Sequence, residues 1–112
     1  MTPEGFQERR RYPRVKTEIP LELRHSGSTA PLRATTSEIS IGGCYIETMF
    51  TLEVGTKLEM VMWLDDQKIN AKGVIATRYP QVGNGIDIVE ISSADRAKLE
   101  AFVRNQEVKR PF

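Results

Sequence analysis

The chain has 112 residues, of which 39% are apolar and 28% are charged, and this length predicts a single domain. No run approaches the ~18 apolar residues that a membrane-spanning helix requires, and the N-terminal part carries no apolar segment typical of a secretory signal. With one cysteine (Cys44) and one histidine (His25), neither an internal disulfide nor a zinc site is expected. We therefore expect a cytoplasmic domain with no membrane span, no metal site and no cofactor.

The charges are unevenly distributed along the chain, although the formal net charge is only +1. Residues 1–16 carry five basic side chains against two acidic ones, whereas residues 37–66 carry six acidic side chains against one basic one. A protein that coats duplex DNA usually has a large overall positive charge. The clustering at one end makes nucleic acid an unlikely partner and favours a small anionic ligand or a local contact.

The N-terminal segment, residues 1–13, has no apolar periodicity and contains two prolines and a glycine, so we expect a flexible arginine-rich arm. The folded domain is expected to span residues 14–112. From Val15 to Leu23, apolar and polar residues alternate, which predicts a half-buried strand. Pro20 falls on the outward-facing set and indicates an edge or a bulge at that point.

Further strands are expected at roughly ten-residue intervals, and a helix follows them. The expected strands are residues 32–36, 44–49, 58–64, 69–78 and 85–89. Ser92 can cap a helix, and Leu99, Phe102 and Val103 follow at helical spacing, so a helix is predicted over about residues 92–106. Six short strands and one helix predict an all-β fold, a six-stranded antiparallel β-barrel with a C-terminal helix.

Few residues could carry catalysis. His25 lies in a Ser/Gly turn with no nucleophile or acid beside it in the sequence, and Cys44 is typical of a small core or surface residue. The paired carboxylates Asp65 and Asp66 are better explained by a hairpin turn. We expect no catalytic residues and do not expect an enzyme.

The basic segment from Arg9 to Arg14 is the first candidate binding element. Arginine presents a planar fork of donors that binds phosphate oxygens or a guanine edge through two hydrogen bonds, and its face can stack on a base. Pro13 favours an extended Tyr12, so Arg10 and Arg14 would be spread over roughly 13 Å. This span suits a ligand with more than one phosphate or base, but a solvated basic arm explains the composition equally well.

The second candidate element is the segment from Glu38 to Gly43, which joins two expected strands. The two glycines, Gly42 and Gly43, permit unusual backbone angles and close approach of a ligand. The Ser40 hydroxyl can bond either its own turn or a phosphate, and the Glu38 carboxylate can accept from the donor edge of a guanine. Alone, the segment fits an ordinary glycine turn better.

Taken together, the two segments resemble the two motifs of the PilZ domain, a bacterial receptor family for the second messenger cyclic di-GMP. Arg10 and Arg14 match the RxxxR motif of the family. Ser40 and Gly43 match the [D/N]xSxxG motif, although Glu38 stands where Asp or Asn is usual. The segment 83–88 is similar to a late strand of the family, so the resemblance covers nearly the whole chain.

The resemblance implies a cyclic di-GMP sensor in which the arm wraps over a ligand on the barrel surface. Arg10 and Arg14 would contact phosphate and guanine, and Ser40 with the backbone of Gly42 and Gly43 would hold the other side. In this family an arginine at the position of Arg9 is associated with two stacked ligand molecules. Ordering of residues 7–14 would then present a changed surface to an unknown protein partner.

Two other interpretations remain open at this point. Glu38 places its carboxylate about an ångström further out than Asp would, and PilZ-like domains with altered motifs exist that bind no nucleotide and act through protein contacts. The other interpretation is a basic-armed barrel that binds nucleic acid. Its candidate stacking residues are Tyr12, Tyr45, Trp63 and Tyr79.

Overall fold

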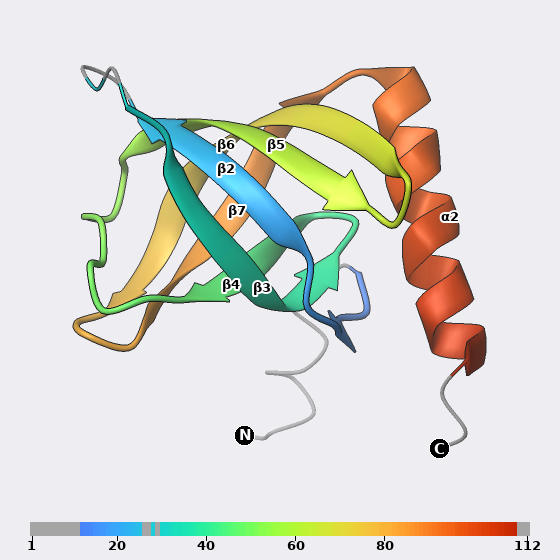
Figure 1. Ribbon diagram of the computed structural model, residues 1–112, viewed down its shortest axis with the longest axis horizontal. Coiled ribbons are helices and arrows are strands. Elements are labelled where there is room, and N and C mark those ends of the chain that lie inside the picture. The colour runs from blue at the N-terminus through green and yellow to red at the C-terminus, as the bar shows by residue number, and fades with distance from the viewer. Residues whose placement is uncertain (1–11, 26–27, 29, 110–112) are drawn as a thin grey trace, which may run out of the picture.

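The computed structural model describes residues 12–25, 28 and 30–109, in which strands lead into a single long helix at the C-terminal end (Figure 1). The elements are β1 (Val15–Lys16), β2 (Pro20–His25), β3 (Leu32–Ser40), β4 (Gly43–Glu47), β5 (Lys57–Leu64), β6 (Gln67–Tyr79), β7 (Gly83–Ile91) and α2 (Ser93–Lys109).

The strands form one antiparallel sheet that closes on itself. Its order is β1-β3-β2-β5-β6-β7-β4, and the additional pairing of β3 with β4 joins the two sides. Six strands, β2 to β7, therefore make a closed barrel. The two-residue β1 pairs with Glu38 and Ile39 of β3, beyond the residues of β3 that pair with β2. The all-β fold, the six-stranded antiparallel barrel and the C-terminal helix predicted from the sequence are confirmed.

Side chains of alternate residues fill the barrel. On β5, Leu58, Met60, Met62 and Leu64 are each at most 3% exposed, whereas the residues between them are half-buried or exposed. Full burial of such a side chain contributes about 1.5–3 kcal/mol. The period-2 pattern of the sequence thus identifies the inner face of the barrel.

The first expected strand is interrupted, and the interruption has a specific cause. It divides into β1 and β2, and Thr17–Ile19 leave the regular ladder just before Pro20. Thr36 of β3, which is 2% exposed, bridges the gap: its hydroxyl donates to the Thr17 carbonyl (2.7 Å) and accepts from the Ile19 amide (3.0 Å). Pro20 is the first residue of β2, where its missing N–H is tolerated.

Several boundaries predicted from the sequence were wrong, and two of these differences change where particular residues lie. β3 continues to Ser40, so Glu38 and Ser40 lie on the strand and only Ile41–Gly42 form the turn. β7 begins at Gly83, so Asn84 is a buried strand residue and not part of a loop. Its side-chain amide accepts from the Leu52 amide (2.8 Å) and donates to the carbonyls of Leu52 and Thr77, which fixes the β4–β5 connection against the barrel.

The helix α2 packs against β6 and β1 at one side of the barrel (Figure 1). The Ser92 hydroxyl accepts from the Asp95 amide (3.1 Å) and caps its first turn. Leu99, Phe102 and Val103 form its buried stripe, as their spacing predicts. No helix in the described part of the chain is long and apolar enough to cross a membrane.

Candidate functional site

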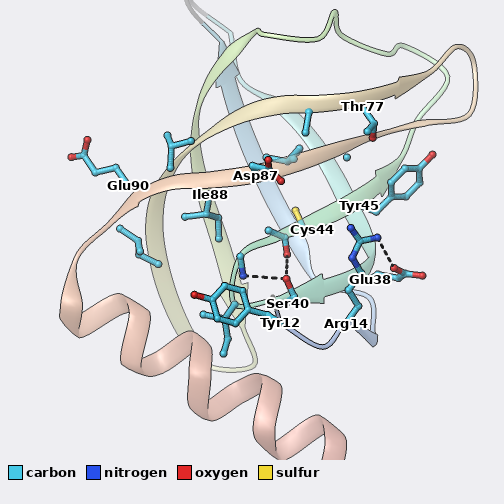
Figure 2. Close-up of a pocket in the computed structure, with 18 of the residues that line it drawn as sticks. Tyr12, Arg14, Glu38, Ser40, Cys44, Tyr45, Thr77, Asp87, Ile88 and Glu90 are labelled. Carbon is cyan, nitrogen blue, oxygen red and sulfur yellow. Dashed lines mark hydrogen bonds and ion pairs between the residues drawn. The ribbon is translucent and has the colours of Figure 1, made fainter. Parts of the chain in front are cut away.

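A broad groove of about 1300 Å³ lies on the outer face of β3, β4, β6 and β7 (Figure 2). Its walls are Tyr12 and Arg14 from the segment before β1 and Arg96 from α2. Two cross-strand rows form its floor: Glu38, Tyr45, Gly85 and Thr77 in the first, and Ser40, Gly43 and Asp87 in the second. The strands therefore bring residues from four parts of the chain onto one surface.

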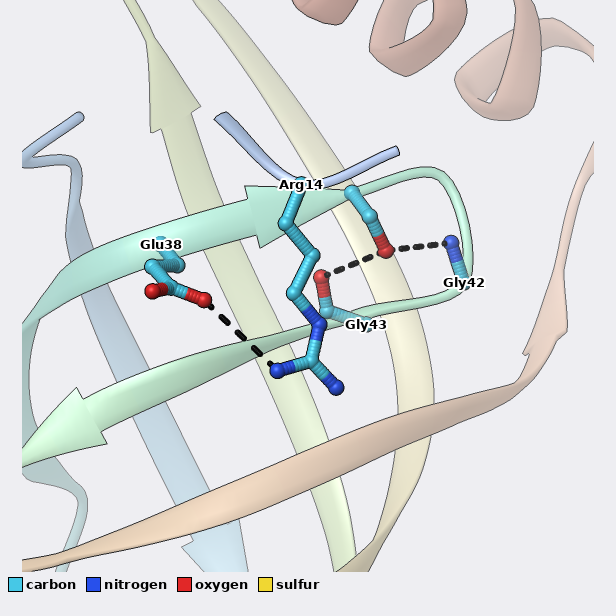
Figure 3. A network of polar contacts seen from close by, with 5 residues as sticks. Arg14, Glu38, Gly42 and Gly43 are labelled. Atoms are coloured by element: carbon cyan, nitrogen blue, oxygen red, sulfur yellow. Dashed lines mark hydrogen bonds and ion pairs between the residues drawn. The ribbon is translucent and has the colours of Figure 1, made fainter. Parts of the chain in front are cut away.

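Arg14 and Glu38, one residue from each predicted motif, contact each other in this groove. Arg14 Nη1 lies 3.6 Å from Glu38 Oε1, and the two side chains are 46% and 32% exposed (Figure 3). An exposed pair of this kind contributes at most about 1 kcal/mol to stability. Both groups can therefore exchange partners at little cost when a ligand enters the groove.

Ser40 shapes the turn between β3 and β4. Its hydroxyl accepts a hydrogen bond from the Gly42 amide (3.1 Å) and donates one to the Gly43 carbonyl (3.4 Å) (Figure 3). The residue is only 7% exposed. Of the two roles considered for this hydroxyl, the bond to its own turn is the one that the structure shows.

The two glycines of the turn have different close neighbours, and only Gly43 faces a backbone atom. A Cβ at Gly43 would collide with the backbone carbonyl of Ile86 on the adjacent β7. A Cβ at Gly42 would lie 2.9 Å from the Tyr12 ring. The Gly42 carbonyl also accepts from the Ile88 amide (2.9 Å), so the turn is attached directly to β7.

A contact between Tyr12 and Arg96 joins the N-terminal segment to the helix, and the sequence did not predict it. Arg96 Nη2 donates to the Tyr12 hydroxyl (3.1 Å), and the guanidinium lies 5.7 Å from the ring centroid. This hydrogen bond is the main reason why the pKa of Arg96 is raised, so the group stays charged. The two residues are 84 positions apart, so no local sequence pattern indicates their contact. On the helix itself, Arg96 also pairs with Glu100 (3.5 Å).

Three of the four aromatic residues considered for stacking line the groove: Tyr12, Tyr45 and Tyr79. The rings of Tyr45 and Tyr79 lie 6.4 Å apart at an angle of 52°. Burial raises the pKa of the Tyr45 hydroxyl, and nearby Tyr79 and Glu47 raise it further, so this hydroxyl remains a neutral donor. Trp63 lies on β5 and does not contribute to the groove.

Arg9 and Arg10 lie outside the described residues, as does most of the predicted arm, so their place relative to the groove stays a prediction. Within the described ranges, no group of three or more His, Cys, Asp or Glu could hold a metal ion. Cys44 points into the core, and burial raises the pKa of its thiol to about 12. A thiol held neutral in this way is a poor nucleophile.

The family model of the PilZ domain matches residues 8–105, which is most of the chain and includes both motifs. The chain belongs to the PilZ family. No curated protein matches it. The resemblance inferred from Arg10–Arg14 and Glu38–Gly43 is therefore confirmed at the level of the family.

Solved structures show the same fold at low sequence identity. The inhibitor of motility MotI/DgrA of Bacillus subtilis is 19% identical with a TM-score of 0.77; the match covers 91% of this chain but only 53% of that protein. The PilZ domain of YcgR from Escherichia coli, solved with c-di-GMP, is 13% identical with a TM-score of 0.73, covering 90% and 93% of the two chains. The PilZ domain of CeSA from a cellulose-synthesizing bacterium is 15% identical with a TM-score of 0.68, covering 85% and 98%. The chain thus spans about half the length of MotI/DgrA.

Proposed function

We propose that this PilZ domain binds cyclic di-GMP in the groove and acts as a sensor. The observation that carries the proposal is that Arg14 and the segment from Glu38 to Gly43 open onto one groove. The ligand has two guanines and two phosphodiesters, so it needs guanidinium groups, carboxylate acceptors and flat apolar surfaces, and all three are present. The related domain of YcgR, which was solved with c-di-GMP, supports the same ligand.

In this proposal each motif residue has a distinct role. Arg10 and Arg14 bind phosphate and guanine through their guanidinium groups. Glu38 exchanges its contact with Arg14 for the donor edge of a guanine. Ser40 holds the turn in shape, and the glycines at positions 42 and 43 let the ligand approach the backbone.

The size of the groove is compatible with two stacked ligand molecules. Its volume of about 1300 Å³ exceeds the roughly 300–1,000 Å³ typical of a site for one small molecule. Arg9 would contact the second molecule. Ligand binding would change the conformation of residues 7–14 and thereby the surface that a protein partner contacts.

Isothermal titration calorimetry with cyclic di-GMP, cyclic di-AMP and GTP tests the proposal. We expect saturable binding of cyclic di-GMP, with one or two molecules per chain, and much weaker binding of cyclic di-AMP and GTP. The same titration with Arg10→Ala should show binding weakened by tenfold or more. No heat with cyclic di-GMP at high protein concentration would overturn the proposal.

One observation favours a second candidate, a PilZ domain that binds no nucleotide and acts through protein contacts. Glu38 replaces the usual Asp or Asn, and its carboxylate already contacts Arg14 in the described structure. In that case the ion pair would stay intact, because no nucleotide would compete for either group. Absence of nucleotide binding, with binding restored by Glu38→Asp, would support this candidate.

A nucleic-acid-binding role predicts a different result in the same experiment. Affinity for an oligonucleotide would then fall steeply with salt, because bound counterions are released. The near-zero net charge of the chain argues against it. A salt-independent preference for cyclic di-GMP over oligonucleotides would exclude this role.

A further inference from the structure

Asp87 differs from the other carboxylates that line the groove. The described residues that line the groove include three carboxylates, those of Glu38, Asp87 and Glu90. Glu38 pairs with Arg14 (3.6 Å), and Glu90 lies 4.0 Å from Lys72. The Asp87 side chain forms neither an ion pair nor a hydrogen bond with any described residue.

The fold directs Asp87 into the groove. On β7, Ile86 is 2% exposed and points into the barrel, so the next residue points outward. Asp87 lies opposite Gly43 in the ladder with β4, and Gly85 precedes it on the same face. The space that a Cβ of Gly43 or Gly85 would need is filled by the β7 backbone and by Thr77, whereas the Asp87 side chain is exposed and lines the groove (Figure 2).

A free carboxylate here has a definite consequence for a nucleotide ligand. Its charge repels the phosphates of any cyclic dinucleotide. Hydrogen bonds that the carboxylate accepts from the same molecule can offset this repulsion. Guanine offers two adjacent donors, N1–H and N2–H₂, that match the two carboxylate oxygens. Adenine offers one donor and one acceptor on the corresponding edge, so a carboxylate binds it less well.

A ligand with two guanines can use two such acceptors, and two carboxylates, those of Glu38 and Asp87, lie in the floor of the groove. Glu38 lies on β3, and Asp87 lies on β7, with β4 between them. We propose that Asp87 is a specificity-determining residue that accepts from the donor edge of one guanine and thereby selects guanine over adenine. This inference rests on the proposed function, because it assumes that the ligand is cyclic di-GMP.

The test compares Asp87→Asn with the unchanged chain by calorimetry, using cyclic di-GMP and cyclic di-AMP in one buffer. Asparagine keeps the size of the side chain but replaces one acceptor oxygen with a donor. We expect cyclic di-GMP to bind about ten- to a hundredfold more weakly. Cyclic di-AMP should bind equally well or several-fold better, because a repulsive charge is removed.

Asp66→Asn is the matched control. It makes the same charge change at the exposed β5–β6 turn, outside the groove, and should leave both affinities unchanged. Asp87→Ala removes both acceptor oxygens and should also weaken cyclic di-GMP binding, so the test stays decisive if the asparagine variant is unstable. Thermal unfolding of each variant shows whether the fold is retained.

The outcomes separate this inference from the proposed function. If Asp87→Asn strengthens the binding of both nucleotides equally, the carboxylate only repels phosphate, and the inference is wrong. If cyclic di-GMP binds both proteins with the same affinity, the inference is wrong while the proposed function stands. If the unchanged chain binds no cyclic di-GMP, both are wrong.

Discussion

On β4 and β7, one set of alternate residues lies in the barrel core and the other set lines the groove. Cys44, Ile46 and Ile86 point inward and are at most 9% exposed. Tyr45 and Asp87 point outward into the groove. The inward set is constrained by close packing, so its substitutions should change stability. The outward set is constrained mainly by what the groove contacts, so its substitutions should change binding.

Gly43 belongs to the outward set on β4, yet it is constrained by close packing as the inward set is. Its substitution should have the largest effect on stability. A Cβ at Gly43 would collide with the Ile86 carbonyl, a backbone atom that cannot rotate away. We expect Gly43→Ala to destabilise the barrel by about 3 kcal/mol, the upper end for overpacking. The melting temperature, followed by circular dichroism, should fall by more than about 10 °C.

Gly42→Ala is the control for that prediction. Its Cβ would lie 2.9 Å from the Tyr12 ring, a side chain outside the barrel that can move. The expected loss of stability is below about 1 kcal/mol. Equal melting temperatures for the two alanine variants would show that the β4–β7 contact is not as tight as the structure indicates.

Arg14 tests the outward side of the comparison. Charge-assisted hydrogen bonds contribute about 1.5–3 kcal/mol each, so Arg14→Ala should weaken cyclic di-GMP binding tenfold or more. Arg14→Lys should not restore it, because an ammonium group lacks the planar fork. The melting temperature without ligand should barely change, since the lost ion pair is exposed.

Arg33→Ala is the matched control for Arg14→Ala. Arg33 pairs with Glu22 at 3.3 Å on the barrel surface, and neither residue lines the groove. The variant therefore removes the same kind of exposed ion pair without removing a groove residue. If both variants bind cyclic di-GMP with equal affinity, Arg14 does not belong to the site.

Glu38 should show a smaller effect because its length departs from the family pattern. Glu38→Ala removes an acceptor and should cost about 1–3 kcal/mol in binding. Glu38→Asp should bind at least as well as the unchanged chain, because it restores the shorter carboxylate. Calorimetry on the three proteins at one salt concentration measures the series, and equal binding by all three would exclude Glu38 from the site.

The inward residues were largely predictable from the sequence, and the reason is physical. Alternation at Leu58, Met60, Met62 and Leu64 identifies a buried face because a strand turns every second side chain to the same side. Strand ends were less predictable. The local sequence does not show whether Ser40 ends β3 or lies in the turn. In the structure it is the last residue of β3, and its hydroxyl accepts a hydrogen bond from the Gly42 amide in the turn.

From the sequence, only those residues of the groove that belong to a local motif could be predicted. Arg14, Glu38 and the turn at Gly42–Gly43 were identified from their spacing. Asp87 and Arg96 were not, because their place in the groove depends on cross-strand register and helix packing between distant segments. A period-2 pattern shows that Asp87 faces outward, but only the barrel shows that Gly43 lies beside it.

Cys44 provides the last and smallest test, on the inward face. Burial raises the pKa of its thiol from 9.0 to about 12, so the folded chain keeps this proton at a pH where the unfolded chain loses it. The folded state then binds more protons, and stability falls as the pH rises from about 9 toward 12. The loss due to this group should be roughly 1 kcal/mol at pH 10. Because tyrosines and lysines also titrate there, the measurement is the difference in urea-unfolding free energy between the unchanged chain and Cys44→Ala at pH 8 and pH 10. We expect this difference to shrink by roughly 1 kcal/mol at the higher pH. A constant difference would mean that the Cys44 thiol titrates normally in the folded barrel and that this position is open to solvent, as the groove side of β4 is.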